Sequence, residues 1–182
     1  MRKVIPSSKD LESVLNSSIP DIIKSDLKIL FCGINPGLYT AYVKQHFGRP
    51  GNKFWKALYQ AKFTPNLFHP SEQYSLLTLG YGITNLVNRA TVSQADLKKE
   101  EFVQGGKKLT IKAEKYKPEW ISFVGIDAYR QAFNFPKAVV GRQEITIGTS
   151  KVWLLPSTSG LNAFYTLEKL TILFGELRNE VR

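Results

Sequence analysis

Asn35 is the residue whose type and position most clearly permit chemistry in this sequence. It stands in the run Gly33-Ile34-Asn35-Pro36-Gly37, directly after the apolar segment 28–32. A carboxamide cannot act as a general base at neutral pH, but it can position a water molecule and stabilise charge. Asn-Pro next to glycine also forms tight turns that have no catalytic role. The residue types alone therefore leave a catalytic asparagine and an ordinary turn both open.

The neighbouring segments indicate where Asn35 lies. The short apolar run 28–32 contains Ile, Leu and Phe, which predicts a buried strand. Asn52 can cap a helix in which Phe54, Trp55 and Leu58 recur at helical spacing. The order strand, polar loop, helix places Asn35 at the carboxyl end of a strand, where open α/β sheets bind ligands.

The rest of the chain predicts more strands and helices of the same kinds. The predicted strands cover 28–32, 120–124, 144–148 and 151–155, the last two as a hairpin, and 83–87 is expected to be a brief strand or an extended segment. Further predicted helices cover 10–15, 71–79, 96–116, 127–133 and 167–181. Ser71 and Asp127 are expected to cap two of them. This alternation indicates an α/β fold: a three-layer α/β/α domain with a central, mostly parallel sheet. Residues 1–25 are expected to be an N-terminal extension, and residues 26–182 the domain itself.

Two features of the segment around 96–116 each admit two interpretations. Gly105-Gly106 either breaks the helix, since glycine costs about 1 kcal/mol relative to alanine, or lets the helix pack closely on the sheet. The lysines of this region form either a solvated outer face or a contact surface for a polyanion. They are Lys98, Lys99, Lys107, Lys108, Lys112, Lys115 and Lys117.

Composition limits the classes of protein. The 182 residues carry 25 Lys and Arg against 15 Asp and Glu, a net charge of +10 that suits either a polyanionic partner or a basic solvated surface. The single cysteine, Cys32, excludes an internal disulfide and a cysteine-based zinc site. His46 and His69 do not cluster, so no metal site is expected. No apolar run reaches ~18 residues and the N-terminus lacks a signal-peptide core, so we expect an intracellular protein without a membrane partner.

Five segments, separate but in order, resemble one known family. They are Gly33 to Leu38; His46-Phe47 with Pro50-Gly51-Asn52 and Phe54-Trp55-Lys56; Gly82 to Arg89; Gly105 to Leu109; and Leu155 to Leu161. Together they resemble the mismatch-specific uracil-DNA and thymine-DNA glycosylases, over residues 27 to 178. The resemblance implies a monofunctional DNA-repair glycosylase that flips uracil out of duplex DNA and hydrolyses its N-glycosidic bond, with thymine or etheno-cytosine opposite guanine as alternative substrates. It further implies a monomer that needs no metal or cofactor and has double-stranded DNA as its partner.

The resemblance also implies roles for individual residues. Asn35 matches the asparagine that orients the attacking water, and Phe47 matches the aromatic on which the flipped base stacks. His46 and Thr84 match positions of the thymine-processing branch that assist the leaving group or hold the water. Thr40 lies where small residues face the C5 edge of uracil. The backbone N–H groups of the glycine-rich turn are expected to stabilise the departing base. That turn contributes Gly33, Ile34, Gly37 and Leu38. Without the resemblance, His46 and Phe47 would equally be core residues.

A second site segment is the loop Ser157-Thr158-Ser159-Gly160-Leu161. From its residues it is a strand-to-helix turn. In the family the equivalent loop enters the minor groove, as apolar wedges do in other proteins. The resemblance makes Leu161 the wedge that fills the gap left by the extruded nucleotide, and Gly160 the backbone that faces the widowed guanine.

Two departures from the family pattern keep other functions open. The bacterial branch usually has Asn-Pro where this chain has Ser157-Thr158, and often an arginine where it has Ala163. These changes favour the alternative of a non-catalytic nucleic-acid-binding module on a degenerate glycosylase fold. A nucleotide-binding α/β protein is a third alternative, although the turn after residue 32 lacks the Gly-Lys-Ser/Thr ending of a P-loop.

Overall fold

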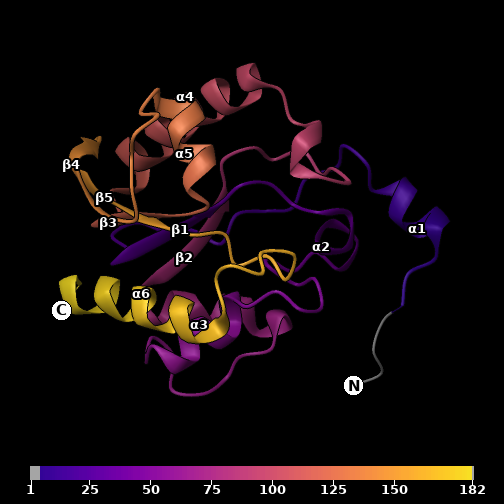
Figure 1. The fold of residues 1–182 in the computed structure, drawn as a ribbon, viewed down its shortest axis with the longest axis horizontal. Coiled ribbons are helices and arrows are strands. Elements are labelled where there is room, and N and C mark those ends of the chain that lie inside the picture. Colours follow the sequence, from indigo (N-terminus) through magenta and orange to yellow (C-terminus); the bar gives the residue numbers. More distant parts are fainter. Residues whose placement is uncertain (1–4, 182) are drawn as a thin grey trace.

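The computed structural model describes residues 5–181 and has a five-stranded sheet at its centre (Figure 1). The strands are β1 (Ile29–Gly33), β2 (Tyr81–Asn85), β3 (Trp120–Val124), β4 (Gly141–Ile147) and β5 (Ser150–Leu155). Their order is β2-β1-β3-β5-β4, and only the β4–β5 hairpin is antiparallel. The predicted mostly parallel sheet is therefore confirmed, with β2 displaced two residues toward the N-terminus from its expected position.

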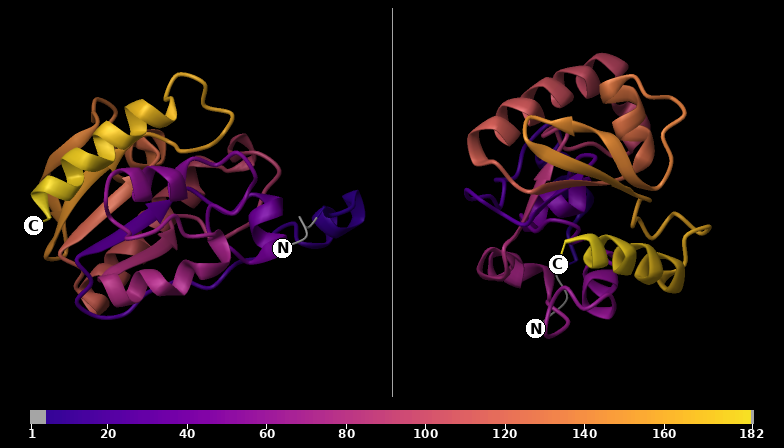
Figure 2. Two further views of the ribbon diagram at one scale, coloured as in Figure 1. Left: turned by 90° about the horizontal axis from the view of Figure 1, so that it is seen from below. Right: turned by 90° about the vertical axis from the view of Figure 1, so that its left-hand side faces the viewer.

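Helices cover both faces of this sheet, which confirms the three-layer prediction (Figure 2). One face packs against α3 (Phe54–Gln60), the 3₁₀ helix η1 (Pro70–Leu79) and α6 (Leu167–Glu180). The other face packs against α4 (Lys99–Tyr116) and α5 (Ile126–Phe133). The short helices α1 (Ser8–Ser13) and α2 (Leu38–Val43) and the turn η2 (Gln94–Asp96) lie outside these layers.

The interior strand β1, between β2 and β3, is buried on both faces, as its apolar sequence requires. Phe31 points into the layer of α3 and α6, where its ring meets those of Phe54 and Phe174 at centroid distances of 5.5 and 6.2 Å. Cys32 points into the opposite layer and is 1% exposed. Burial raises the pKa of its thiol, since the thiolate would lose its hydration.

Several local predictions need correction. His69, not Ser71, caps η1, because its ring nitrogen accepts a hydrogen bond from the Ser71 backbone N–H. Gly125, not Asp127, precedes α5; Asp127 lies in the first turn and pairs with Arg130 at 2.9 Å. Helix boundaries of this kind depend on which backbone N–H groups tertiary contacts leave unpaired.

The glycine pair of α4 lies within an unbroken helix of 18 residues. A Cβ atom on Gly105 would lie 2.3 Å from the Leu86 carbonyl oxygen, and one on Gly106 would lie 3.2 Å from that of Ala132. The pair therefore allows close packing on the segment after β2 and on α5. Close packing rather than a helix break is the correct interpretation.

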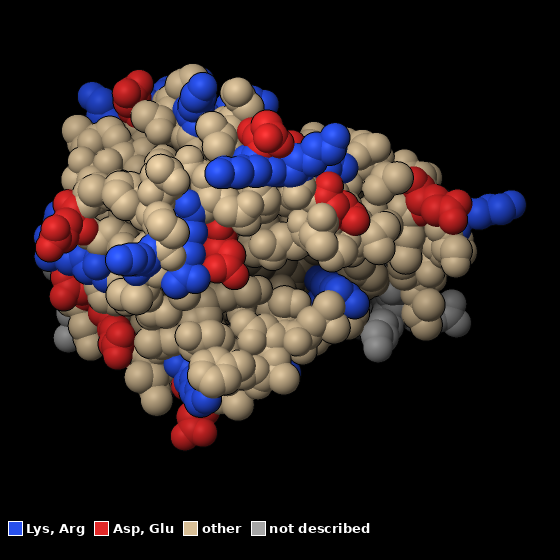
Figure 3. Space-filling view, turned by 45° about the horizontal axis from the view of Figure 1, so that its top comes forward, with Lys and Arg blue, Asp and Glu red and all other residues tan. Residues whose placement is uncertain are grey.

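The lysines of α4 do not all lie on its outer face. Lys112 is half-buried, forms an ion pair with Asp21 at 2.5 Å and donates a hydrogen bond to Thr84. The basic side chains that remain outside are interspersed with Asp and Glu on the face seen in Figure 3, so this surface is not one positive field. Each helix within residues 5–181 is too short or too polar to span a bilayer.

The chain before β1 also packs into the domain. Ile22 is 1% exposed and exchanges two backbone hydrogen bonds of 2.8 Å with Ile83 of β2. Asp21 beside it pairs with Lys112, as described above. The end of the N-terminal segment thus contributes to the core.

Candidate functional site

A cleft of about 910 Å³ opens beyond the carboxyl ends of the parallel strands. From β1 the chain crosses to β2 on one side of β1, and the next strand, β3, lies on the other side of β1. The neighbours β1 and β3 therefore form a switch point of the sheet. Ligands of open α/β sheets bind at such points. Three segments build most of the cleft wall: the turn after β1, the segment after β2 and the loop after β5.

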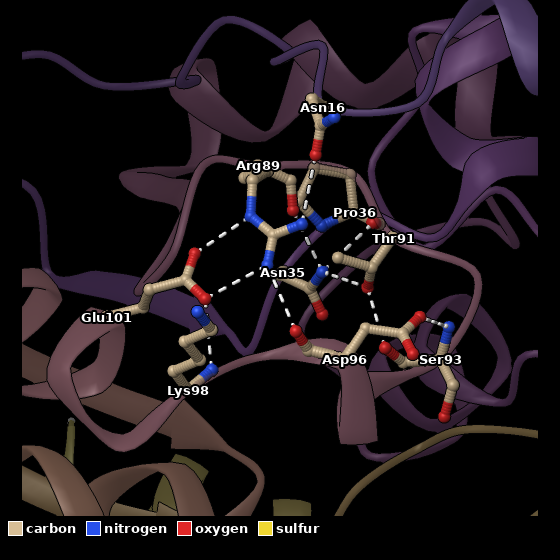
Figure 4. Close-up of polar contacts among 9 residues, drawn as sticks. All are labelled: Asn16, Asn35, Pro36, Arg89, Thr91, Ser93, Asp96, Lys98 and Glu101. Carbon is tan, nitrogen blue, oxygen red and sulfur yellow. Dashed lines mark hydrogen bonds and ion pairs between the residues drawn. The ribbon is translucent and has the colours of Figure 1, made fainter.

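The side chain of Asn35 is held in one orientation at this cleft (Figure 4). Its amide nitrogen Nδ2 donates to the Arg89 carbonyl at 2.9 Å, to Thr91 Oγ1 at 2.7 Å and to the Pro36 carbonyl at 3.3 Å. Carbonyl oxygens only accept hydrogen bonds, so the group that faces them must be the NH₂ group. The oxygen Oδ1 therefore faces the other way, where it can accept a hydrogen bond from a water molecule.

Thr91 and Arg89 form the support behind Asn35. Thr91 is 1% exposed, and its hydroxyl accepts from Asn35 while it donates to the Ser93 carbonyl at 2.8 Å. The Arg89 guanidinium holds its own loop in place through two bonds to Glu101 of α4, at 2.8 and 2.9 Å. These bonds lower the pKa of Glu101 to about 2, so the pair is ionised at neutral pH. Thr91 was not predicted from the sequence.

Phe47 lines the cleft, and one face of its ring is in contact with another aromatic ring of the protein. It stacks on Phe54 with a centroid distance of 3.9 Å and an interplanar angle of 19°. Its φ of +52° lies in the left-handed region, which is rare for a bulky residue and occurs mainly where structure around it enforces the conformation. Hydrogen bonds at the preceding His46, from its N–H to Gln73 and from Trp55 to its carbonyl, supply that constraint.

Asn85 is the site residue that sequence reasoning missed most clearly. It ends β2 beside Gly33, is 8% exposed and lines the cleft. A Cβ atom on Gly33 would lie 2.7 Å from Asn85 Oδ1 and 3.2 Å from the Phe47 ring, so only glycine lets these two groups approach. The available signal was its place at the carboxyl end of a strand next to β1. We name Asn35, Asn85 and Thr91 the floor of the cleft.

The structure does not bring His46 or Thr84 to the cleft. His46 is 2% exposed and its Nε2 donates to the Pro20 carbonyl at 2.9 Å; burial lowers its pKa, although this bond opposes the shift. Thr84 points to the opposite face of the sheet from Asn85, where it donates to Asp21 and accepts from Lys112. Neither residue lines the cleft, and the Nε2 atom of His46 and the hydroxyl of Thr84 are bonded to groups outside it.

The other predicted pocket residues lie at the cleft or directly beneath it. Ile34, Gly37, Leu38 and Thr40 line it, whereas Gly33 lies below Phe47 and Asn85. Within residues 5–181 there is no group of three or more His, Cys, Asp or Glu that could hold a metal ion.

The predicted wedge loop forms one margin of the cleft. Leu161 is 79% exposed, whereas Thr158 is 1% exposed and donates to Asn52 Oδ1 at 2.9 Å. The hydroxyls of Ser157 and Ser159 accept from backbone N–H groups two residues on, at 3.3 Å each. These serines thus stabilise tight turns that present Leu161 to solvent.

Lys53 joins this loop to α3. Its ammonium donates to the carbonyls of Asn162 at 2.8 Å and Tyr165 at 2.9 Å, and its backbone N–H donates to the Thr158 carbonyl at 2.9 Å. A Cβ atom on Gly160 would lie 2.8 Å from the Gly51 carbonyl oxygen, so the loop also packs on the turn before α3. We name the turn 48–51 and the loop 157–162 the lip of the cleft.

Comparison with known proteins identifies this arrangement. Residues 20–178 match the uracil DNA glycosylase superfamily. The chain belongs to this superfamily. Its fold is similar to the solution structure of a candidate uracil DNA glycosylase from Methanosarcina acetivorans, with a TM-score of 0.62 and 18% sequence identity. The similarity covers 90% of this chain and 99% of the archaeal protein. The superfamily expected from the sequence is therefore confirmed, and the cleft lies at the carboxyl edge of its sheet.

Proposed function

We propose that this superfamily member is a monofunctional DNA glycosylase of the mismatch-specific branch, which hydrolyses the N-glycosidic bond of uracil extruded from duplex DNA. The observation that carries the proposal is the fixed orientation of Asn35, whose NH₂ group is bound by three protein acceptors at the floor of the cleft. The oxygen left facing the other way can hold a water molecule in one place. Positioning of this kind is the main contribution that a carboxamide can make to hydrolysis.

The cleft offers complementary groups to an extruded uracil. Its ring can stack on the open side of Phe47, as bases do on aromatic side chains. The carboxamide of Asn85 presents a donor and an acceptor in one plane, which suits the adjacent N–H and carbonyl groups of uracil. Thr40 is 7% exposed and lines the same cleft, where its bulk would disfavour the additional methyl group of thymine. Uracil is therefore the proposed first substrate, and thymine a slower one.

The reaction follows from these positions. The oxygen of the water held by Asn35 bonds to C1′ of the sugar, the C1′–N1 bond breaks, and its electron pair leaves with the uracil ring. The proton released by the water passes to solvent or to the departing base, since the carboxamide does not take it up at neutral pH. No lysine lines the cleft among residues 5–181, and the Lys53 ammonium is bound by two carbonyls. This arrangement supports hydrolysis that forms no Schiff base on a lysine and does not nick the DNA strand.

The test is a base-release assay on a duplex with a single G·U pair, in excess EDTA, with abasic sites revealed by alkali. Matched duplexes carry A·U, G·T or G·etheno-cytosine, and a single strand carries uracil alone. Abasic sites that form on G·U with the parent protein, and not with Asn35→Ala, support the proposal. Tight binding of the duplex without base release would instead identify a non-catalytic nucleic-acid-binding module.

A further inference from the structure

Arg49 is the only charged residue among the described residues that line the cleft. It is exposed, and within residues 5–181 its guanidinium has no ion pair or side-chain hydrogen bond. The other exposed arginine of a folded segment, Arg142, by contrast faces Glu180 at 3.7 Å. An unpaired cation at the entrance of an otherwise neutral cleft attracts an anionic group.

The backbone that carries Arg49 is held in place. Its carbonyl accepts a hydrogen bond of 3.0 Å from the Asn52 N–H, and Gly51 follows with a φ of +88°. A Cβ atom on Gly48 would lie 2.6 Å from the Gln45 carbonyl oxygen, so this turn also packs closely on its other side. Arg49 is thus presented from a fixed turn rather than from a loose loop.

This turn and the wedge loop form one unit. Gly51 touches Gly160, Asn52 is bonded to Thr158, and the Lys53 N–H donates to the Thr158 carbonyl. Arg49 therefore lies on the same lip as Leu161, between the surface that meets the duplex and the floor that meets the base. A nucleotide whose base reaches Asn35 must leave its backbone phosphates at this entrance.

We propose that Arg49 binds one of the two phosphates that flank the extruded nucleotide, and so holds the sugar over Asn35. The inference rests on the proposed function, because it takes the ligand to be an extruded nucleotide. The planar guanidinium matches a phosphate with two parallel N–H···O bonds, which a lysine cannot reproduce. Since Arg49 has no protein partner to give up, binding a phosphate breaks no existing ion pair.

The experiment combines a variant with a neutral linkage in the DNA. Duplexes carry a tetrahydrofuran abasic analogue opposite guanine, with either flanking phosphate replaced singly by a methylphosphonate. Dissociation constants are measured for the parent, Arg49→Ala, Arg49→Lys and the control Arg142→Ala. The control removes the same charge from β4, beside Glu180 at the C-terminal end of α6. Single-turnover rates on the G·U duplex and melting temperatures are recorded on the same preparations.

We expect Arg49→Ala to weaken binding roughly ten-fold, to lower the salt slope by about 0.9, and to leave the melting temperature unchanged. A methylphosphonate at one of the two flanking positions should weaken binding by the parent to the same extent. It should not weaken binding by Arg49→Ala any further, because both changes remove the same contact. Arg49→Lys should lie between the two, and Arg142→Ala should bind like the parent. Additive losses at both linkages, or unchanged binding by Arg49→Ala, would overturn the inference.

The two proposals can fail separately. If the parent protein releases no base from any uracil substrate, the proposed function is wrong, while the binding measurements on the abasic analogue still decide the role of Arg49. If base release is found and the losses are additive, the glycosylase assignment stands and the phosphate contact does not. A loss of rate by Arg49→Ala on the G·U duplex, with unchanged binding to the abasic analogue, would place the guanidinium at the base instead.

Discussion

The floor and the lip of the cleft are both stabilised by hydrogen bonds, but they present different groups to a ligand. At the floor the side chains themselves are bound: Asn35 to three acceptors and Thr91 to two partners, with Thr91 only 1% exposed. At the lip the backbone is bound, through Lys53 and two serines, while the Leu161 side chain is 79% exposed. These floor side chains therefore have their partners within the protein, whereas the lip presents a side chain that is mostly open to solvent.

This difference has a consequence for function. Chemistry requires atoms placed in advance, since reorientation in the transition state costs rate. Separation of two stacked bases requires apolar surface that is free until the duplex arrives. Variants at the floor should therefore change the rate on every substrate, whereas truncation of the exposed Leu161 side chain at the lip should act only where a complementary strand is present.

The largest effect is expected for Asn35→Ala. The change removes the group that positions water, and it should lower the single-turnover rate on G·U duplex by ~10²-fold or more. Single-stranded uracil DNA should lose the same factor, because the floor does not depend on the duplex. Asn88→Ala, an exposed neighbour of the supporting loop, is the matched control and should keep the parent rate. A near-parent rate for Asn35→Ala would refute the mechanistic role of the floor.

Leu161→Ala should have the next largest effect, and only on duplex. The shortened side chain no longer fills the gap of an extruded nucleotide, whose re-closure is favourable by a few kcal/mol, so the rate on G·U duplex should fall about ten-fold. Single-stranded DNA has no partner stack to close and should lose much less. Ile172→Ala, an exposed apolar residue of α6, controls for surface truncation. Equal losses on both substrates, together with a lower melting temperature, would make Leu161 a structural residue.

A smaller effect is expected for Thr91→Val, which preserves shape and removes one acceptor from Asn35. Loss of one such hydrogen bond corresponds to about 1 kcal/mol, or roughly a five-fold lower rate. Thr84→Val makes the same change on the opposite face of the sheet, between Asp21 and Lys112. It should lower thermal stability and leave the rate per folded molecule unchanged. If Thr84→Val lowers the rate more than Thr91→Val, the assignment of these two threonines must be reversed.

The smallest effect concerns His46 and pH. Burial lowers the pKa of His46 below its ordinary value of 6.5, so below that pH the unfolded chain binds a proton that the folded chain does not. The free energy of unfolding should therefore decrease as pH falls below about 6.5. His46→Gln should reduce this dependence. Because His46 lies outside the cleft, this variant should leave the rate between pH 7 and 8 unchanged, as should the exposed His69→Gln, the control for loss of an imidazole. A slower His46→Gln alone would indicate that His46 does act at the site.

Much of the fold could be predicted because its signals are local. The apolar run of β1, the glycine-rich turn after it and the spacing of Leu170, Phe174 and Leu177 each depend on neighbouring residues. The place of Asn35 at the end of a strand was predicted for the same reason, whereas its proposed catalytic role came from the resemblance of the surrounding motif to the glycosylases.

The remainder of the site depends on contacts between distant segments. Thr84 and Asn85 are adjacent, yet alternation along β2 directs Thr84 to the half-buried ion pair of Asp21 and Lys112 and Asn85 to the cleft. A shift of one residue thus exchanges a structural for a functional position. Thr91 meets Asn35 across 56 positions of sequence, and His46 is withdrawn by the carbonyl of Pro20, 26 positions away. Such contacts between distant segments cannot be predicted from the residue types alone.

The reactivity of the Cys32 thiol reports whether the sheet is folded. Cys32 is the only cysteine; it is buried in the interior strand β1 and burial raises the pKa of its thiol, so it can react with a disulfide reagent only after β1 is exposed. The labelling kinetics of native protein therefore measure the opening of the sheet itself, at one atom and without an added probe. Each floor or lip variant can be assayed for base release and for thiol labelling in parallel, so a slow enzyme is distinguished from one that spends more time unfolded.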